Sequence, residues 1–167
     1  MHEKSIDLLN KGVADELVAI HQWMYFHFLC DDQGYDPLAA LFRQVAIEEM
    51  IHTERLAERI LFLGGEVEMK AHSDVQKIHD VSKMLELGKS MEEEAVKMYN
   101  GFAKQCAEHG DSATKKLFED LVTDEEAHYD KFDTQEEHLN KFGEQFLALQ
   151  SIERSRSISS GGSGGEA

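Results

Sequence analysis

The sequence Glu49-Met50-Ile51-His52 and the later sequence Glu125-Glu126-Ala127-His128 share one pattern, a glutamate followed three residues on by a histidine. Residues three apart lie on the same face of an α-helix. Each stretch, if helical, therefore presents a carboxylate and an imidazole toward one point. Two such pairs in one chain indicate two helices that contribute to a shared polar site.

The sequence around these stretches predicts long helices and few turns, because Pro37 is the only proline. Hydrophobic periodicity and glycine positions place the expected helices at about 4–32, 36–63, 82–108, 112–141 and, as a short fifth helix, 144–154. We expect Asp36 to cap the second helix, with Pro37 in its first turn, and Asp111 or Ser112 to cap the fourth. The Ser/Gly-rich remainder, 155–167, is predicted to be a flexible tail after a single domain over 1–154.

Connection lengths predict how the helices are arranged. Short turns join the first helix to the second and the third to the fourth, so each pair should be antiparallel neighbours. The middle connection, over about 66–81, can span about 40 Å and return along a whole helix. The sequence therefore predicts an all-α fold, a four-helix bundle with one long crossover and a short fifth C-terminal helix.

Each of the four long helices has an apolar stripe that a glutamate interrupts near its middle, and these glutamates are Glu16, Glu49, Glu92 and Glu125. Burying an ionised carboxylate without a partner costs several kcal/mol or more. Two divalent cations would balance four carboxylates, while His52 and His128 would add nitrogen ligands. This oxygen-rich set suits iron(II) or manganese(II), and the arrangement is one already known in metal-binding helical bundles.

The expected geometry gives the six residues different roles. Glu49 and Glu125 would bridge the two metal ions, whereas Glu16 and Glu92 would each bind one ion terminally. His52 and His128 would each bind one ion through a ring nitrogen. A single Glu-x-x-His pair is weak evidence for metal, but a purely structural bundle leaves all four core carboxylates unexplained.

The composition excludes several classes of function. The chain has 33 acidic and 17 basic side chains and a formal charge of −16, which disfavours binding to nucleic acid and favours attraction of cations. No apolar run approaches the length of a membrane span and no signal peptide is visible, so we expect a cytoplasmic protein. Cys30 and Cys106 form no CxxC motif, which leaves free buried thiols as the expectation.

With these residues in view, the chain resembles bacterioferritin, the haem-containing branch of the ferritin family, over about residues 1–154. The similarity is strongest at 16–20, 49–52, 58–63 and 124–128. It implies a ferritin-like fold and ferroxidase activity, in which Fe(II) is oxidised by O2 or H2O2 at a diiron site formed by the six residues above. It also implies storage of ferric mineral in a cage of 24 subunits, with the fifth helix near the fourfold axes, and a small ferredoxin as the partner for iron release.

Met50, inside the first Glu-x-x-His pair, is a second marker of the same family. The resemblance implies that Met50 is an axial ligand of haem b, which two subunits share. Met50 lies about 100° around the helix from Glu49, so it can point out of the bundle while Glu49 points in. A thioether is a soft ligand that suits haem iron; the alternative is a methionine that fills a subunit interface.

Three features depart from the family pattern. Trp23 stands where the family usually has a tyrosine near the diiron site, and tryptophan is also oxidisable. The positions that can carry an extra iron site in the family are here Gln44 and Glu48, and an amide is a poor iron ligand. Cys30 and Cys106 have no family role, so we expect both to pack in the core.

Two other functions are compatible with the same residues. One is a diiron or dimanganese enzyme that acts on peroxide or an organic substrate without storage, although the Cys-x-x-Cys domain of a rubrerythrin is absent. The other is a twelve-subunit stress-protection cage, whose usual members place iron between subunits and lack the paired motif. The expected fifth helix favours the larger cage.

Overall fold

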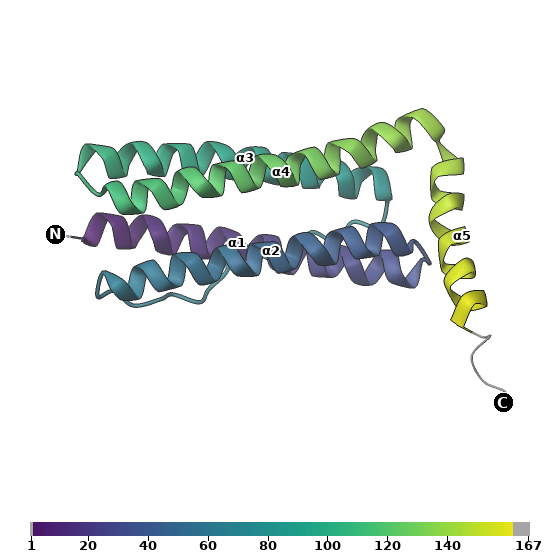
Figure 1. Ribbon diagram of the computed structural model, residues 1–167, viewed down its shortest axis with the longest axis horizontal. Helices are drawn as coiled ribbons and strands as arrows, with labels where there is room; N and C mark the ends of the chain where they lie inside the picture. The colour runs from purple at the N-terminus through teal and green to yellow at the C-terminus, as the bar shows by residue number, and fades with distance from the viewer. Residues whose placement is uncertain (1, 162–167) are drawn as a thin grey trace.

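The structure is a computed structural model that describes residues 2–161, and all of its regular elements are helices. The helices are α1 (Glu3–Asp32), α2 (Asp36–Phe62), α3 (Val81–Glu108), α4 (Ser112–Phe142) and α5 (Glu144–Gly161). Helices α1 to α4 lie side by side in a bundle, and α5 crosses one end of it (Figure 1). The predicted all-α bundle with a C-terminal fifth helix is confirmed.

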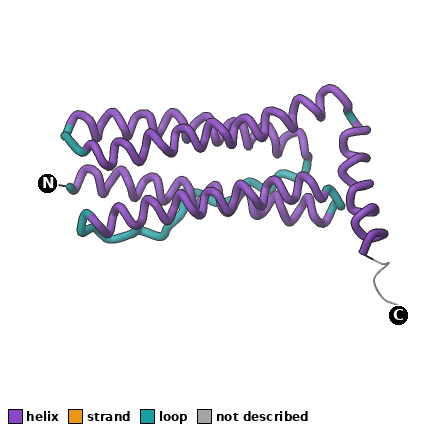
Figure 2. The backbone as a smooth tube through the Cα atoms, in the orientation of Figure 1, coloured by secondary structure: helices purple, strands orange, loops and turns teal. Residues whose placement is uncertain are grey.

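The chain connections follow the predicted topology. Short turns join α1 to α2 and α3 to α4, and these two pairs make the main helix contacts of the bundle. Figure 2 shows the long connection from α2 to α3 running back along the bundle to the end where α3 begins. The crossover therefore lies against the side of the bundle, where it can cover part of the interior.

Polar side chains separate the hydrophobic core into two clusters. One cluster lies toward α5 and includes Trp23, Phe42 and Phe132, while the other lies toward the N-terminus and includes Leu56 and Phe118. On each of the four long helices, the interrupting glutamate falls between the residues that enter one cluster and those that enter the other. The core thus contains a polar layer at the middle of the bundle, between the two hydrophobic clusters.

Gly88 allows a close approach between α3 and α4. A Cβ atom at this position would lie 2.9 Å from Cδ2 of Phe132, which is fully buried. The glycine costs some helix propensity, but it admits the Phe132 ring beside the polar layer.

Helix α5 is fixed to the bundle by polar contacts. Gln150 Oε1 accepts a hydrogen bond from the backbone N–H of Leu38 at 3.1 Å, and Arg154 pairs with Asp31 and Asp36, each at 2.7 Å. The α5 helix is longer than expected, because it continues to Gly161 rather than ending near Arg154. Residues 155–161 of the predicted tail are therefore helical, and the rest of that tail, 162–167, lies outside the described residues.

Two capping predictions have different outcomes. Asp111 caps α4, since its side chain accepts from the backbone N–H of Thr114 at 3.0 Å. The prediction for Asp36 is wrong, because Tyr35 occupies the N-cap position and Asp36 is the first helical residue. Its carboxylate instead binds Arg154, so the tie to α5 takes the place of a cap.

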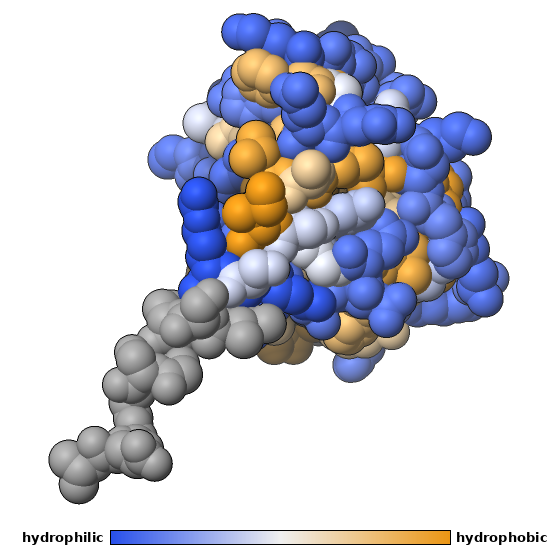
Figure 3. All heavy atoms as spheres, turned by 90° about the vertical axis from the view of Figure 1, so that its right-hand side faces the viewer, coloured by the Kyte–Doolittle hydropathy of each residue, from blue (hydrophilic) through white to orange (hydrophobic). Residues whose placement is uncertain are grey.

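Exposed apolar side chains gather where α5 meets the bundle. Figure 3 views this end directly and shows apolar surface among hydrophilic side chains. Exposed members of α4 and α5 include Phe142, Leu149 and Ile152. None of the helices in residues 2–161 combines the length and hydrophobicity of a membrane span.

Candidate metal centre

The polar layer brings together all six residues that the sequence singled out. Glu16 comes from α1, Glu92 from α3, and the two Glu-x-x-His pairs come from α2 and α4. Each of the six residues is buried, with no more than 3% of its surface exposed. Four carboxylates and two imidazoles therefore share an interior that water hardly reaches.

The donor atoms form two overlapping four-residue sets, besides a three-residue group of Glu49, His52 and His128. The first set is formed by Glu16, Glu49, His52 and Glu125, and the second by Glu49, Glu92, Glu125 and His128. Within each set one donor atom per residue lies within 4.8 Å of every other. Glu49 and Glu125 belong to both sets, which matches their predicted bridging position, while each remaining glutamate is grouped with one histidine.

Several of these donor atoms are close together without being satisfied. Nδ1 of His52 lies 2.9 Å from Oε2 of Glu49, yet neither atom makes a hydrogen bond of suitable geometry. Oε1 of Glu92 is likewise buried without a hydrogen-bond partner. Unpaired buried polar atoms cost about 1–3 kcal/mol each, so they require a compensating partner. All three atoms belong to residues of the same cluster, so cations bound there would supply the missing partners.

Burial and mutual repulsion favour the neutral form of two of the carboxyl groups in the absence of metal. Burial raises the pKa of Glu16 well above its ordinary value, and the charges of Glu49 and Glu125 raise it further. The pKa of Glu92 rises for the same reasons, burial first and then the charge of Glu49. These two carboxyl groups, which come from the helices without the paired motif, therefore bind protons readily.

The histidines carry the compensating positive charge. Burial opposes the charged form of His52, but the nearby carboxylates of Glu125, Glu16 and Glu49 raise its pKa to about 12. His128 behaves in the same way, and its carboxylate neighbours raise its pKa despite burial. In return, the two imidazoles lower the pKa of Glu49 to about 2, although burial alone would raise it. In the metal-free centre, protons on the carboxyl and imidazole groups therefore balance the negative charge that bound cations would balance.

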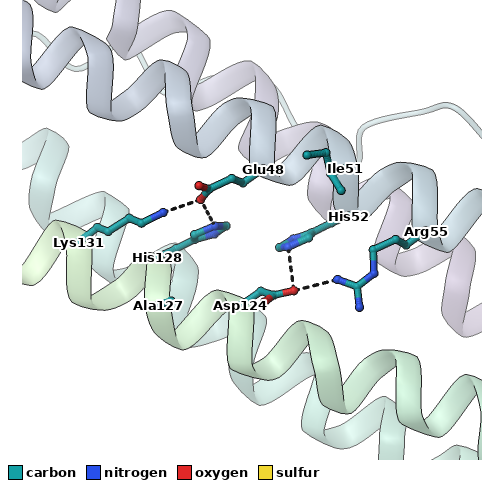
Figure 4. A pocket seen from close by; sticks show the side chains of 8 residues that line it. All are labelled: Glu48, Ile51, His52, Arg55, Asp124, Ala127, His128 and Lys131. Carbon is teal, nitrogen blue, oxygen red and sulfur yellow. Dashed lines mark hydrogen bonds and ion pairs between the residues drawn. The ribbon is translucent and has the colours of Figure 1, made fainter.

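Each histidine is held from outside by a second carboxylate, and each of these by a cation (Figure 4). Nε2 of His128 lies 2.8 Å from Oε2 of Glu48, which also accepts from Lys131 at 2.5 Å. Nε2 of His52 lies 3.4 Å from Oδ2 of Asp124, which accepts from Arg55 at 2.8 Å.

Both outer pairs come from one repeated spacing. In each motif the outer acid directly precedes the glutamate that both donor sets share, and the basic residue follows the histidine by three positions. Each acid contacts the histidine of the opposite motif. The contacts between the α2 and α4 stretches are therefore reciprocal. Such outer partners fix the orientation of a histidine ligand.

Two aromatic side chains contact the carboxylates from inside. The indole Nε1 of Trp23 lies 3.4 Å from Oε1 of Glu49. The buried hydroxyl of Tyr99 donates to Oε1 of Glu16. The sequence pointed to Trp23 near the site, whereas Tyr99 was not singled out. Its position seven residues after Glu92, two turns along the same face, is the signal that could have found it.

The centre lies between two openings on different sides of the bundle. A pocket of about 310 Å³ between α2 and α4 exposes the outer edges of both histidines and is lined by their outer partners. A second pocket of about 290 Å³ lies mainly between α1, α3 and the crossover, and Glu16, Glu49, Glu92 and Glu125 all line it. The first opening thus reaches the two histidines, whereas the second reaches the four central carboxylates.

Three further features that the sequence singled out can be located in the structure. Met50 is 50% exposed whereas Glu49 is 1% exposed, so adjacent residues point out of and into the bundle. Gln44 donates to Glu48 at 3.0 Å, and Glu48 is already engaged by Lys131 and His128. Cys30 and Cys106 are both buried and form no disulfide.

Four helices that surround a buried centre of four carboxylates and two imidazoles define a ferritin-like bundle with a diiron-type site. A family model described as a ferritin-like domain matches residues 6–142. The chain is 39% identical over 145 residues to bacterioferritin from Desulfovibrio desulfuricans, covering 87% of this chain and 81% of that protein. It is 37% identical over 153 residues to bacterioferritin from Rhodobacter capsulatus, covering 87% and 91%. The chain therefore belongs to the bacterioferritin family.

Solved structures of these relatives share the fold. An X-ray structure of the D. desulfuricans protein, which describes its diiron site in different catalytic states, matches with a TM-score of 0.87 at 38% identity and covers 89% of this chain and 86% of that chain. A structure of the R. capsulatus protein, with a metal-free dinuclear site and a haem iron, matches with a TM-score of 0.84 at 35% identity and covers 89% and 92%.

Proposed function

We propose that this chain oxidises Fe(II) to Fe(III) at the buried Glu/His centre, with O2 or H2O2 as the oxidant, and stores the product as ferric mineral. The observation that carries the proposal is the pair of four-residue donor sets that share Glu49 and Glu125. A shared pair of carboxylates suits two ions held side by side, as paired metals in proteins commonly lie about 3.5–4 Å apart.

The residues fit two divalent ions. Glu16 and His52 would hold one ion and Glu92 and His128 the other. The donor atoms without partners, on Glu49, His52 and Glu92, all belong to these sets. Two adjacent Fe(II) ions supply two electrons to the oxidant in a single step, which avoids the release of superoxide.

The chain's own side chains prepare the centre for this chemistry. Glu48 and Asp124 orient the two histidines from outside, as described above. Trp23 contacts a bridging carboxylate and is itself oxidisable, which makes it a candidate electron donor in place of the family's tyrosine. The protons on the metal-free carboxyl and imidazole groups must leave when cations bind.

Storage requires an enclosed volume, which one helical bundle lacks. We propose a cage of 24 copies, in line with the family to which the chain belongs. The apolar side chains exposed where α5 crosses the bundle give a surface that neighbouring copies can cover (Figure 3). The length of α5 favours this assembly over a twelve-subunit cage. A small ferredoxin as electron donor and a cytoplasmic location stay predictions from the sequence.

Met50 fits a haem site between two copies. Its thioether is half exposed, and Ile47, one turn earlier on α2, is 37% exposed beside it. An exposed thioether in an apolar setting can bind one face of haem iron, and the same residue of a second copy can bind the other. We propose haem b at this interface; the related R. capsulatus protein holds a haem iron.

Initial rates of aerobic Fe(II) oxidation test the proposed centre. Glu92→Ala removes one carboxylate donor and should slow the rapid phase by at least about a hundredfold, more than the loss of an outer partner would. Glu93→Ala is the matched control, because its side chain is exposed on the next position of α3. Assembly should be intact in both variants. An unchanged initial rate in Glu92→Ala would reject Glu92 as a ligand.

A further inference from the structure

The two openings to the centre differ in charge. The opening between α2 and α4 is lined by Arg55 and Lys131, whose ion pairs with Asp124 and Glu48 close over the histidines. The opening between α1 and α3 has no lysine or arginine among its lining residues. Instead it is lined by six acidic side chains and no basic one but His72, the acidic residues being Asp15, Glu16, Glu49, Glu92, Glu94 and Glu125. A cleft lined by one sign of charge concentrates ions of the opposite sign, so the α1/α3 opening is the favourable path for a cation.

Asp15 and His72 face each other in this opening. Asp15 directly precedes Glu16 on α1, while His72 lies on the crossover far along the chain. Nε2 of His72 is 3.1 Å from Oδ1 of Asp15, and the two side chains are 54% and 34% exposed. His72 thus lies at the exposed side of the opening, and its partner Asp15 is adjacent in sequence to Glu16 of the buried centre.

Two amide side chains of α1 hold the crossover at this place. Asn10 donates to the carbonyl of Glu66 and accepts from the N–H of Glu68, both at 2.9 Å. Gln22 makes the same two kinds of bond with the backbone of Gln76, at 3.0 and 2.7 Å. The segment between these two attachments carries His72, so its position over the opening is built into the fold.

We propose that Asp15 and His72 form an entry site for divalent cations, which bind there before they pass to Glu16 and the centre. Two ligands bound to one ion at about 2.1 Å and at right angles lie about 3.0 Å apart. The 3.1 Å between Nε2 and Oδ1 therefore admits a cation in place of the hydrogen-bonding proton with little movement of either side chain. A carboxylate with an imidazole is a donor pair suited to Fe(II).

The destination of the cation lies in the same opening. Oε2 of Glu49 and Oε1 of Glu92 are buried without hydrogen-bond partners, and both residues line this pocket. A cation at Asp15 would lie beside the residue that precedes Glu16, in the pocket that Glu49 and Glu92 also line. The inference rests on the proposed function only in requiring that the centre binds divalent cations.

Trp23 gives a direct measurement of cation arrival. It is the only tryptophan of the chain, and its indole nitrogen lies 3.4 Å from Oε1 of Glu49. Co(II) quenches such fluorescence and is not oxidised under anaerobic conditions, so quenching in a stopped-flow instrument reports loading without turnover. The assembled metal-free protein is mixed with Co(II), and both the association rate and the final stoichiometry are recorded.

We expect His72→Gln and Asp15→Asn each to lower the association rate of Co(II) by at least about tenfold. The stoichiometry of the quenching, which reports binding at the centre beside Trp23, should stay at that of the parent, because neither residue belongs to the donor sets. Asp7→Asn, which removes the same charge from an exposed position of α1, should load at the parental rate.

Three results would overturn the entry site. They are parental rates in both variants, an equal slowing in Asp7→Asn, or a lower stoichiometry in His72→Gln. A parent protein that shows no Co(II)-dependent quenching would instead contradict the proposed metal centre itself, so the two failures are distinguishable.

Discussion

Glu48 and His128 are joined across the α2/α4 side of the centre, with Oε2 of Glu48 2.8 Å from Nε2 of His128. Lys131 holds the same carboxylate oxygen from outside at 2.5 Å. In the family this position can carry part of an extra iron site, and here Glu48 contacts a candidate metal ligand. Asp124 is the corresponding partner of His52. The binding of each of the two proposed ions can therefore be weakened separately.

Glu48→Ala should weaken one of two Co(II) sites by about ten- to a hundredfold, the usual effect of removing an outer partner of a histidine ligand. Asp124→Ala should weaken the other site to a comparable extent. Equilibrium titration monitored by Trp23 fluorescence measures both affinities. Glu54→Ala, at an exposed position of α2, is the control. Two unaltered sites in Glu48→Ala would refute its orienting role.

The metal-free protein should become less stable as pH rises. The pKa values of Glu16 and Glu92 are raised in the folded state above 4.5, and that of His52 is raised from 6.5 to about 12. The folded chain therefore binds more protons than the unfolded chain above these ordinary values, and the free energy of unfolding falls with rising pH.

Urea unfolding in the presence of a chelator should thus give a lower midpoint at pH 8 than at pH 5.5. Protons and cations compete for the same groups, so Co(II) affinity should change in the opposite direction and increase with pH. Metal-free stability that rises between these two pH values would contradict the charge assignment.

Met50→Leu tests the proposed haem site. Leucine keeps the apolar surface but lacks a sulfur ligand, so haem-supplied protein should lose the absorption bands of methionine-ligated haem. Met69→Leu is the matched control, because Met69 is 65% exposed on the crossover. Identical haem spectra for Met50→Leu and the parent would rule out axial ligation by Met50.

Gly88→Ala tests the contact between α3 and α4. The new Cβ would lie 2.9 Å from the buried Phe132 ring, and overpacking of this kind costs about 1–3 kcal/mol, against a gain of about 1 kcal/mol in helix propensity. We expect a net decrease in the free energy of unfolding. Gly101→Ala, with no atom within 4 Å of its Cβ, should instead stabilise the protein by about 1 kcal/mol. Denaturant unfolding of both variants measures the difference, and equal effects would contradict the packing argument.

The sequence was sufficient to predict the bundle and to single out the residues of the polar layer. Helical periodicity places Glu16, Glu49, Glu92 and Glu125 on apolar stripes, and a buried charge on a stripe is conspicuous. The outward direction of Met50 follows equally from the 100° step between adjacent helical residues. These predictions depend only on the geometry of a single helix, so they needed no knowledge of how the helices are packed.

Contacts between distant segments could not be predicted in this way. The outer acids Glu48 and Asp124 look like ordinary surface residues until α2 and α4 are placed side by side. His72 lies in a crossover without periodicity, and its meeting with Asp15 depends on the two amide attachments of α1. The capping of α2 was mispredicted because Tyr35 is at the N-cap and Asp36, which pairs with Arg154 of α5, is already helical.

The most direct test of the proposed function is the iron that the purified protein retains after aerobic addition of Fe(II), measured together with particle mass. A storing ferroxidase should yield a large particle of many chains that retains far more than two iron atoms per chain. A monomer or dimer that retains no more than two iron atoms per chain would contradict the account.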